Sequence, residues 1–214
     1  RRRLGLAHKP AVVVPNNMLE QFTREWQQLY PQAKLLAAYP DDVTAERRRR
    51  FVGRVATNVW DAVVMTRTTF QRLSLSPANQ GAYMDRELAL IRDQLDAARS
   101  GGAPSSRTMK QLEKSMLRRE EQLKKLLDTP VDPGVTFEAS GIDLLVVDEL
   151  HDYKNLATPS NIRDAAITGS QRASDLHMKI DYLRQQNGGR ALVAATATPI
   201  ANSVTEMWVL QRYL

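Results

Sequence analysis

Asp148, Glu149 and His151 stand close together, directly after the apolar run from Leu144 to Val147. Carboxylates at the end of a buried strand can hold a magnesium ion through its water ligands, and they can orient or deprotonate an attacking water. An imidazole beside them can pass on a proton or a hydrogen bond. The alternative without chemistry is an aspartate that caps the next turn and a histidine at the surface. The elements around these residues must decide between the two interpretations.

The apolar run before Asp148 is one of several short runs that are continuous rather than alternating. Such runs are typical of strands covered on both faces by helices. They predict strands over residues 11–15, 34–39, 61–66, 142–147 and 190–196. Stretches with apolar residues at helical spacing predict helices over 17–30, 46–55, 174–186 and 202–214. Strands that alternate with helices predict an α/β fold, with a parallel sheet covered by helices on both faces.

One segment, from Gly81 to Asp128, lacks any strand signal. Its first half has an apolar helical stripe, and a second stripe follows the turn sequence SGGAPSS at 100–106. We therefore expect an antiparallel helical hairpin at 79–130, inserted between residues 1–78 and 131–214 of one lobe. The second arm of the hairpin is basic. It could grip a phosphate backbone, or its charges could simply keep an exposed coiled coil in solution.

The chain of 214 residues carries a net charge of +6 and has a pI near 9.7, which favours polyanionic partners such as nucleic acid. Arginines cluster at 1–3, near Lys9, and at 47–50, but solvated helix faces explain these clusters equally well. The absence of cysteine excludes disulfides and thiolate metal sites. No apolar run approaches the roughly 20 residues that a membrane span needs. Because the chain starts with Arg1 rather than methionine, we expect a piece of a longer polypeptide.

The segments at the predicted strand ends resemble motifs of the superfamily-two helicases and translocases, most closely the branch that resembles chromatin remodellers. VVDELHDYKN looks like motif II, a DExH box followed by a Lys-Asn pair. ATATPIANSVTEMWVLQRYL looks like motif III, with Ala197 in place of a glycine. VVVPNNMLEQFTREW is similar to motif Ia and VVMTRTTFQRL to motif Ib, so the motifs follow one another in the family's order.

The resemblance implies a RecA-like lobe and a role for each matching residue. Asp148 would coordinate magnesium through water, Glu149 would position the hydrolytic water, and His151 would link the nucleotide site to motif III. The motif III residues implied to couple hydrolysis to nucleic-acid contact are Thr196, Thr198 and Asn202. The residues implied to lie near the phosphate backbone are Asn16, Asn17, Arg67 and Thr68. For Lys154 and Asn155 we expect no more than closure of the loop.

The chain also departs from the helicase pattern. No G-x-x-x-x-G-K-[ST] sequence occurs, so no glycine-rich loop is present to cradle phosphates. We expect ATP and Mg²⁺ to bind only in a longer polypeptide that supplies this loop and a second RecA-like lobe, and we expect the isolated chain to be inactive. The expected external partner is DNA, taken to be double-stranded, in the cytoplasm of a bacterium or of a cell infected by a phage.

The hairpin and the spacing of the motifs are similar to the helicase part of very large bacterial and phage polypeptides that are often labelled adenine-specific DNA methylases. No Asn-Pro-Pro-Tyr or Asp-Pro-Pro-Tyr methylase motif occurs in this chain. Two other classes of function stay open. One is a non-catalytic module that binds nucleic acid or protein through its basic surface. The other, less favoured, is a metal-dependent nuclease or phosphatase, because such sites usually gather more carboxylates than this sheet edge offers.

Overall fold

A five-stranded sheet, all parallel, forms the centre of the molecule in the order β2-β3-β1-β4-β5. The computed structural model describes residues 5–100, 110, 113–114, 116–118, 120–121, 135–158, 167, 169–200 and 204–214. The strands are β1 Pro10–Val14, β2 Leu35–Ala38, β3 Ala62–Thr66, β4 Leu144–Val147 and β5 Leu192–Ala194. Each predicted strand is therefore confirmed.

Strand β1 lies in the middle of the sheet, where Val13 is paired with Met65 of β3 on one side and with Val147 of β4 on the other. Every side chain of β3 is buried, and so are the side chains of β1 after Pro10. Strands that are buried on both faces need apolar side chains at every position, which explains the continuous apolar runs of the sequence.

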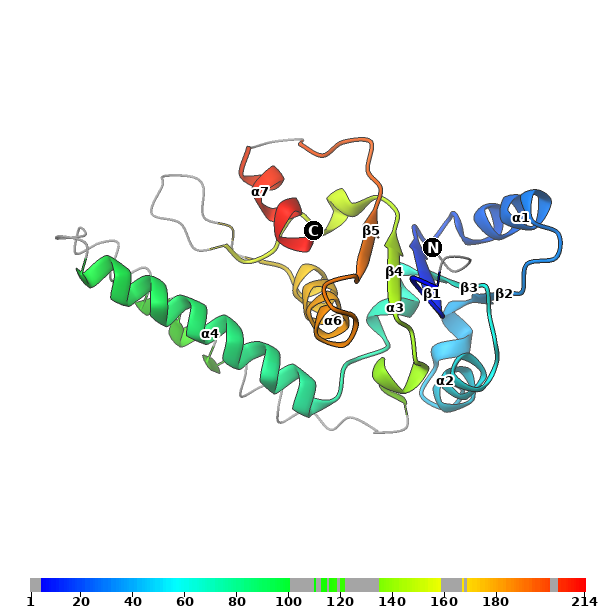
Figure 1. Ribbon diagram of the computed structural model, residues 1–214, viewed down its shortest axis with the longest axis horizontal. Helices are drawn as coiled ribbons and strands as arrows, with labels where there is room; N and C mark the ends of the chain where they lie inside the picture. The colour runs from blue at the N-terminus through cyan, green and yellow to red at the C-terminus, as the bar shows by residue number, and fades with distance from the viewer. Residues whose placement is uncertain are drawn as a thin grey trace.

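Helices cover both faces of the sheet and give it three layers. Figure 1 labels the helices and strands; the α-helices are α1 Leu19–Leu29, α2 Arg48–Thr57, α3 Arg67–Gln71, α4 Pro77–Ser100, α6 Gln171–Asn187 and α7 Val204–Tyr213. Short 3₁₀ segments are η2 Pro40–Val43, η4 Glu138–Ser140 and η5 Leu150–Tyr153. Helix α1 packs on the face that includes Val12 and Val64, whereas α2, α3, α6 and α7 contribute to the larger core on the other face. The α/β three-layer fold expected from the sequence is confirmed.

Two lysines, half-buried Lys9 and fully buried Lys179, hold helices of the larger core in place. Lys9 Nζ donates to the carbonyl oxygens of Val55 at 2.6 Å and Ala56 at 2.8 Å, near the end of α2. Lys179 Nζ donates to the carbonyl of Phe70 at 2.8 Å and pairs with Asp175 at 2.7 Å, which ties α3 to α6. Burial lowers the pKa of both lysines, and a nearby aspartate opposes that effect in each case. Lys9 therefore does not belong to an open basic patch.

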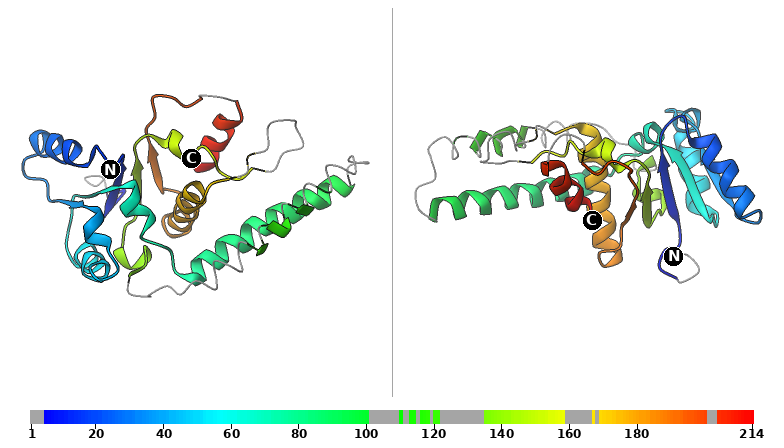
Figure 2. Two further views of the ribbon diagram at one scale, coloured as in Figure 1. Left: turned by 180° about the vertical axis from the view of Figure 1, so that it is seen from behind. Right: turned by 90° about the horizontal axis from the view of Figure 1, so that it is seen from above.

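Helix α4 is the long helix that extends away from the sheet (Figure 2). The predicted apolar stripe on it is buried at Met84, Leu88, Ile91 and Leu95. Its start is fixed by Glu138, whose Oε1 accepts hydrogen bonds from the amide and the hydroxyl of Ser76, each at 2.8 Å.

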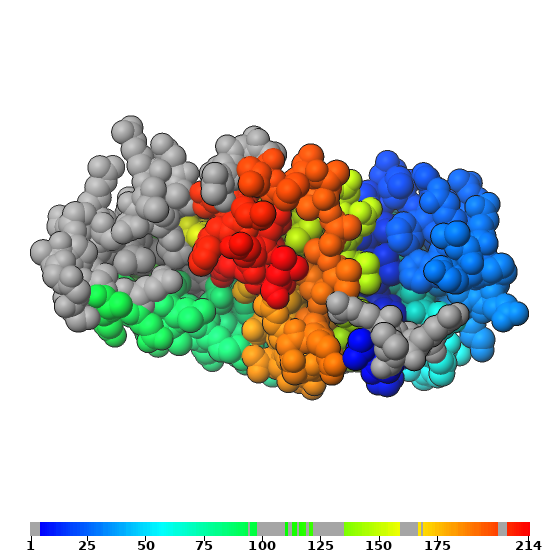
Figure 3. Space-filling model, turned by 45° about the horizontal axis from the view of Figure 1, so that its top comes forward, coloured from blue at the N-terminus to red at the C-terminus, as the bar shows by residue number. Residues whose placement is uncertain are grey.

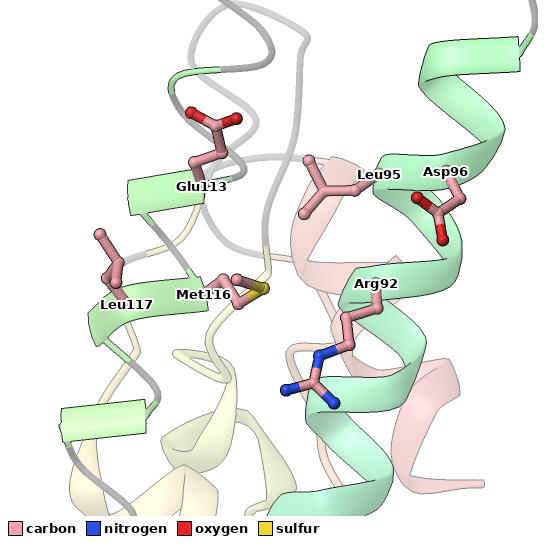
Figure 4. A pocket seen from close by; sticks show the side chains of 6 residues that line it. All are labelled: Arg92, Leu95, Asp96, Glu113, Met116 and Leu117. Atoms are coloured by element: carbon pink, nitrogen blue, oxygen red, sulfur yellow. The ribbon is translucent and has the colours of Figure 1, made fainter.

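The described residues of the predicted second arm lie beside α4. Arg92 on α4 is 3.6 Å from Glu120, and a groove of about 550 Å³ separates the two segments (Figure 4). The groove is lined by Arg92, Leu95, Asp96, Glu113, Met116 and Leu117. The turn at 101–109 and residues 122–134 lie outside the described residues. The hairpin as a whole and the division at 78 and 130 stay predictions.

Within the part of the chain that the structure describes, none of the helices combines the length and the apolar character needed to span a membrane.

The junction of α4, α6 and α7 is built around His177, whose side chain is buried. Its Nδ1 is 2.7 Å from the hydroxyl oxygen of Tyr83, and its ring lies edge-on to the rings of Tyr83 and Tyr213. Burial lowers the pKa of His177 from 6.5 to about 4, because a charged imidazole would lose its hydration here. The folded state therefore favours the neutral imidazole of His177.

This burial predicts a pH dependence of stability. Since the pKa of His177 is lower in the folded state, the unfolded chain binds more protons between pH 4 and 6.5, and the free energy of unfolding falls as the pH falls through that window. The loss should be on the order of 3 kcal/mol. We expect His177→Gln to be less stable than the wild type at pH 7, with a difference that shrinks toward pH 4. Urea unfolding at several pH values measures this, and a difference independent of pH would contradict it.

Candidate functional site

The predicted site residues follow the carboxyl ends of strands β1, β3, β4 and β5. Because parallel strands all end at the same edge of a sheet, these segments converge. In the space-filling view the segment after β4 lies between the segment after β5 and the residues that follow β1 (Figure 3). The candidate site is therefore one edge of the sheet, assembled from segments far apart in sequence.

The two acids sit on backbone that is held firmly by the sheet. The amide of Asp148 donates to the carbonyl of Val13 at 2.9 Å, which extends the pairing of β4 with β1. Glu149 then adopts φ 55° and ψ 55°, and among the described residues no other side-chain-bearing residue has a positive φ. A left-handed conformation at such a residue costs on the order of 1–3 kcal/mol and is maintained only where the surroundings impose it. Strain of this kind is often found at functional sites.

His151 lies beside both Glu149 and the threonine that follows β5. Its Nδ1 is 3.0 Å from Thr196 Oγ1 and 3.0 Å from Glu149 Oε2. Glu149 Oε2 is shielded from solvent and has no hydrogen-bond donor aligned with it among the described residues. Two acceptor oxygens around one ring nitrogen favour a proton on Nδ1, directed at Thr196, with the carboxylate close by. His151 therefore contacts the segment like motif III at Thr196, and its role as a link from the nucleotide site stays a prediction.

Thr196 also contacts Thr198, the other motif III residue that the structure describes. The amide of Thr198 donates to Thr196 Oγ1 at 3.2 Å, and Thr198 itself is exposed. Asn202 lies outside the described residues. The coupling role of these residues stays a prediction.

The predicted nucleic-acid contacts divide into two groups. Asn16 and Thr68 lie side by side, with Asn16 Nδ2 donating to Thr68 Oγ1 at 2.9 Å, and Asn16 and Asn17 are exposed. Arg67 differs, because its guanidinium pairs with Asp152 and only 17% of its side chain is exposed. The first group is available to an external ligand in this structure, and Arg67 is engaged within the protein.

Two residues gain a structural partner that the sequence did not predict. Lys154, which we expected only to close a loop, pairs through Nζ with Glu206 Oε1 of α7 at 2.9 Å. Asp152 pairs with Arg67 and also lies 3.7 Å from His151 Nε2 through its other oxygen. The sequence carries no local signal for the first pair, because Lys154 belongs to the segment like motif II and Glu206 to the segment like motif III.

Asp148 supplies a carboxylate at this edge that could help to bind a metal ion whose other ligands are waters and phosphate oxygens. Asp148 is half-buried, and its Oδ1 accepts the amide of Glu149 at 3.0 Å. Among the described residues no group of three or more histidine, cysteine or acidic side chains could hold a metal ion by itself. Magnesium, unlike zinc, is commonly bound by one or two carboxylates together with waters and phosphate oxygens. Asp148 could serve as such a ligand.

The fold and the site together define an α/β protein whose candidate ligand-binding edge lies at the carboxyl ends of parallel strands. Residues 1–214 match the sequence family described as "Probable helicase domain", and the chain belongs to that family. A relative is the "Defense against restriction protein B" of Escherichia phage P1, which is 28% identical over 66% of this chain. The chain spans 6% of that relative's length.

The Lys154–Glu206 pair provides a test of how α7 is fixed to the site. Only 23% of the Lys154 side chain and 9% of the Glu206 side chain is exposed. The loss of one partner therefore leaves the charge of the other poorly solvated. We expect Lys154→Met to lower the free energy of unfolding by about 1–3 kcal/mol and to speed hydrogen exchange in α7. The double variant Lys154→Met, Glu206→Gln should recover part of the loss. A single variant as stable as the wild type would show that the pair does not hold α7.

Proposed function

We propose that the chain is most of the first RecA-like lobe of a superfamily-two, DNA-dependent ATPase, a helicase or translocase. The observation that carries the proposal is the contact of His151 with both Glu149 and Thr196, which joins the DExH-like segment to the segment like motif III. The family match to a helicase domain supports the same class. Neither acid would be distinctive alone, but their position beside this imidazole and hydroxyl fits the family's chemistry.

Each residue at the edge has a proposed task. Asp148 would bind magnesium through water, and the ion would screen the charge that develops on transferred phosphate. Glu149 would orient the attacking water and accept its proton. His151 would hold Thr196 and thereby report the state of the nucleotide to the segment Thr196–Thr198 and to Asn202. Asn16, Asn17 and Thr68 would contact the phosphate backbone of DNA, proposed to be double-stranded.

The phosphate-binding loop and the second lobe would come from other parts of a longer polypeptide. ATP and Mg²⁺ are therefore proposed as cofactors of that polypeptide, which could also carry an adenine-specific DNA methyltransferase. The phage relative spans far more sequence than this chain, and its name assigns it a role in defence against restriction. A DNA-directed motor fits such a role, and we propose a comparable setting for this protein.

The role proposed for Glu149 can be tested by substitution. In a longer polypeptide with DNA-stimulated ATPase activity, we expect Glu149→Gln to lower kcat by at least about 100-fold, because the amide cannot accept the proton of the attacking water. The binding of ATP and DNA should be retained. Steady-state phosphate release measures kcat, and Asp93→Asn, an exposed change on α4, is the matched control. Full activity of the Glu149 variant would refute the role proposed for this residue.

The activity of the isolated chain provides another test. We expect the 214 residues alone to show no magnesium-dependent hydrolysis of ATP above background, since no glycine-rich phosphate loop is present in the sequence. DNA binding that weakens steeply with salt and ignores nucleotide would instead favour a non-catalytic binding module. Hydrolysis by the isolated chain that Glu149→Gln abolishes would contradict the prediction.

A further inference from the structure

An ion pair connects two segments at the ligand-binding edge that the sheet itself keeps apart. Arg67 begins α3, directly after β3, and Asp152 lies in η5, after β4. In the sheet, β1 lies between these strands. The Arg67 guanidinium therefore reaches across the end of β1 to the Asp152 carboxylate. The contact joins the segment like motif Ib to the segment like motif II.

The burial of this pair differs from that of the neighbouring predicted DNA contacts. Only 17% of Arg67 and 29% of Asp152 is exposed, and Arg67 Nε is shielded from solvent with no acceptor aligned with it among the described residues. Asn16 and Asn17, at the end of β1, are exposed. A phosphate could bind Arg67 only at the expense of its pairing with Asp152. An arginine in this position is better placed to organise the protein than to receive the nucleic acid.

Asp152 lies near the second ring nitrogen of His151, not the one that faces Glu149 and Thr196. Its Oδ1 is 3.7 Å from His151 Nε2, which is too long for a hydrogen bond, whereas Nδ1 is 3.0 Å from Thr196 Oγ1. An unpaired carboxylate here would favour the other tautomer, in which Nε2 carries the proton and donates to Asp152 while Nδ1 no longer donates to Thr196. Arg67 binds the other oxygen of Asp152, and in this arrangement the Nδ1 side of the ring faces Thr196.

We propose that Arg67 is a positioning residue that acts on His151 through Asp152, and that it is not a phosphate contact. The next residue, Thr68, is hydrogen-bonded to exposed Asn16 at 2.9 Å, so a ligand that moves Asn16 would also move Thr68 and Arg67 beside it. The ion pair thus gives the nucleic-acid side of the edge a direct mechanical connection to the proposed nucleotide side. This connection rests on the proposed function, whereas the positioning of His151 does not.

The positioning role can be tested in the 214-residue chain without nucleotide or DNA. Long-range proton–nitrogen NMR spectra resolve the imidazole nitrogens of His8, His151 and His177, and a His151→Asn variant assigns them. We expect Arg67→Ala and Asp152→Asn each to shift the His151 resonances, and the double variant to shift them no further. Resonances of buried His177 should stay in place and report that the fold is intact. Unchanged His151 resonances in both single variants would overturn the proposal.

Arg72→Ala is the matched control, because Arg72 follows α3 and its Nη1 donates to the carbonyl of Pro40 at 2.9 Å rather than to Asp152. It should leave His151 unshifted. If Arg67→Ala disturbs His177 as well, the nearly isosteric Asp152→Asn decides the outcome on its own.

A DNA titration separates positioning from phosphate binding. We expect Arg67→Ala to leave the slope of log affinity against log salt unchanged, whereas loss of a phosphate contact would reduce it by about 1. A reduced slope would therefore overturn the proposal. Where the longer polypeptide hydrolyses ATP, Arg67→Ala should lower DNA-stimulated kcat roughly 5- to 150-fold, in the range of typical couplings between sites, with little change in KM for ATP. A chain that binds no DNA would count against the proposed function, while the NMR result would still decide the role of Arg67.

Discussion

The candidate site depends on a clamp of backbone hydrogen bonds around Glu149. The amide of Asp148 donates to Val13 of β1, and the carbonyl of Val147 accepts the amide of Ala195 beyond β5, both at 2.9 Å. The amide of Leu150 then donates to Ala195, also at 2.9 Å. Glu149 is thus fixed on either side in sequence, and the left-handed conformation between these bonds is imposed by strands on both sides of β4. Without parallel neighbours on both sides, the turn would relax and Glu149 would leave His151.

The helical layer fixes the Arg67 side of the Arg67–Asp152 pair, as the strands fix the backbone around Glu149. Lys179 is fully buried on α6, and its ammonium group bonds the carbonyl of Phe70 and lies 4.0 Å from the centre of the Phe70 ring. Phe70 belongs to the same short helix that begins with Arg67. Removing the Lys179 charge would leave Asp175 and that carbonyl without their partner in the core. The helix that carries Arg67 is therefore anchored in the core, while its first residues lie at the candidate ligand-binding edge.

Much of this architecture could be predicted from local sequence. The apolar runs predicted every strand, because strands covered on both faces need apolar residues throughout. The stripe on α4 was predicted for the same kind of reason, since helical spacing and burial are linked. The position of Asp148 and Glu149 followed from the rule that parallel strands end at one edge.

The pairings between charged side chains could not be predicted in this way. The resemblance to motif Ib implied a phosphate contact for Arg67, and nothing in the sequence singled out Asp152 as its partner. Which of them meet depends on the order of strands in space, since β3 and β4 flank β1 although long segments separate them in the chain. The same holds for Lys154 and Glu206, which belong to different motifs. Local spacing fixes the element on which a charge lies, and the topology determines the partner.

This distinction changes what the net charge of +6 means for ligand binding. Lys9 and Lys179 bond helix carbonyls and Arg67 and Lys154 pair with acids, so these cations serve the fold. The proposed DNA contacts near them are neutral groups, Asn16, Asn17 and Thr68. Amides and hydroxyls are common donors to phosphate oxygens, and they position a backbone without reading its sequence. A motor that must step along DNA of any sequence needs contacts of that kind, and a surface of neutral donors would release each phosphate more readily than a row of arginines.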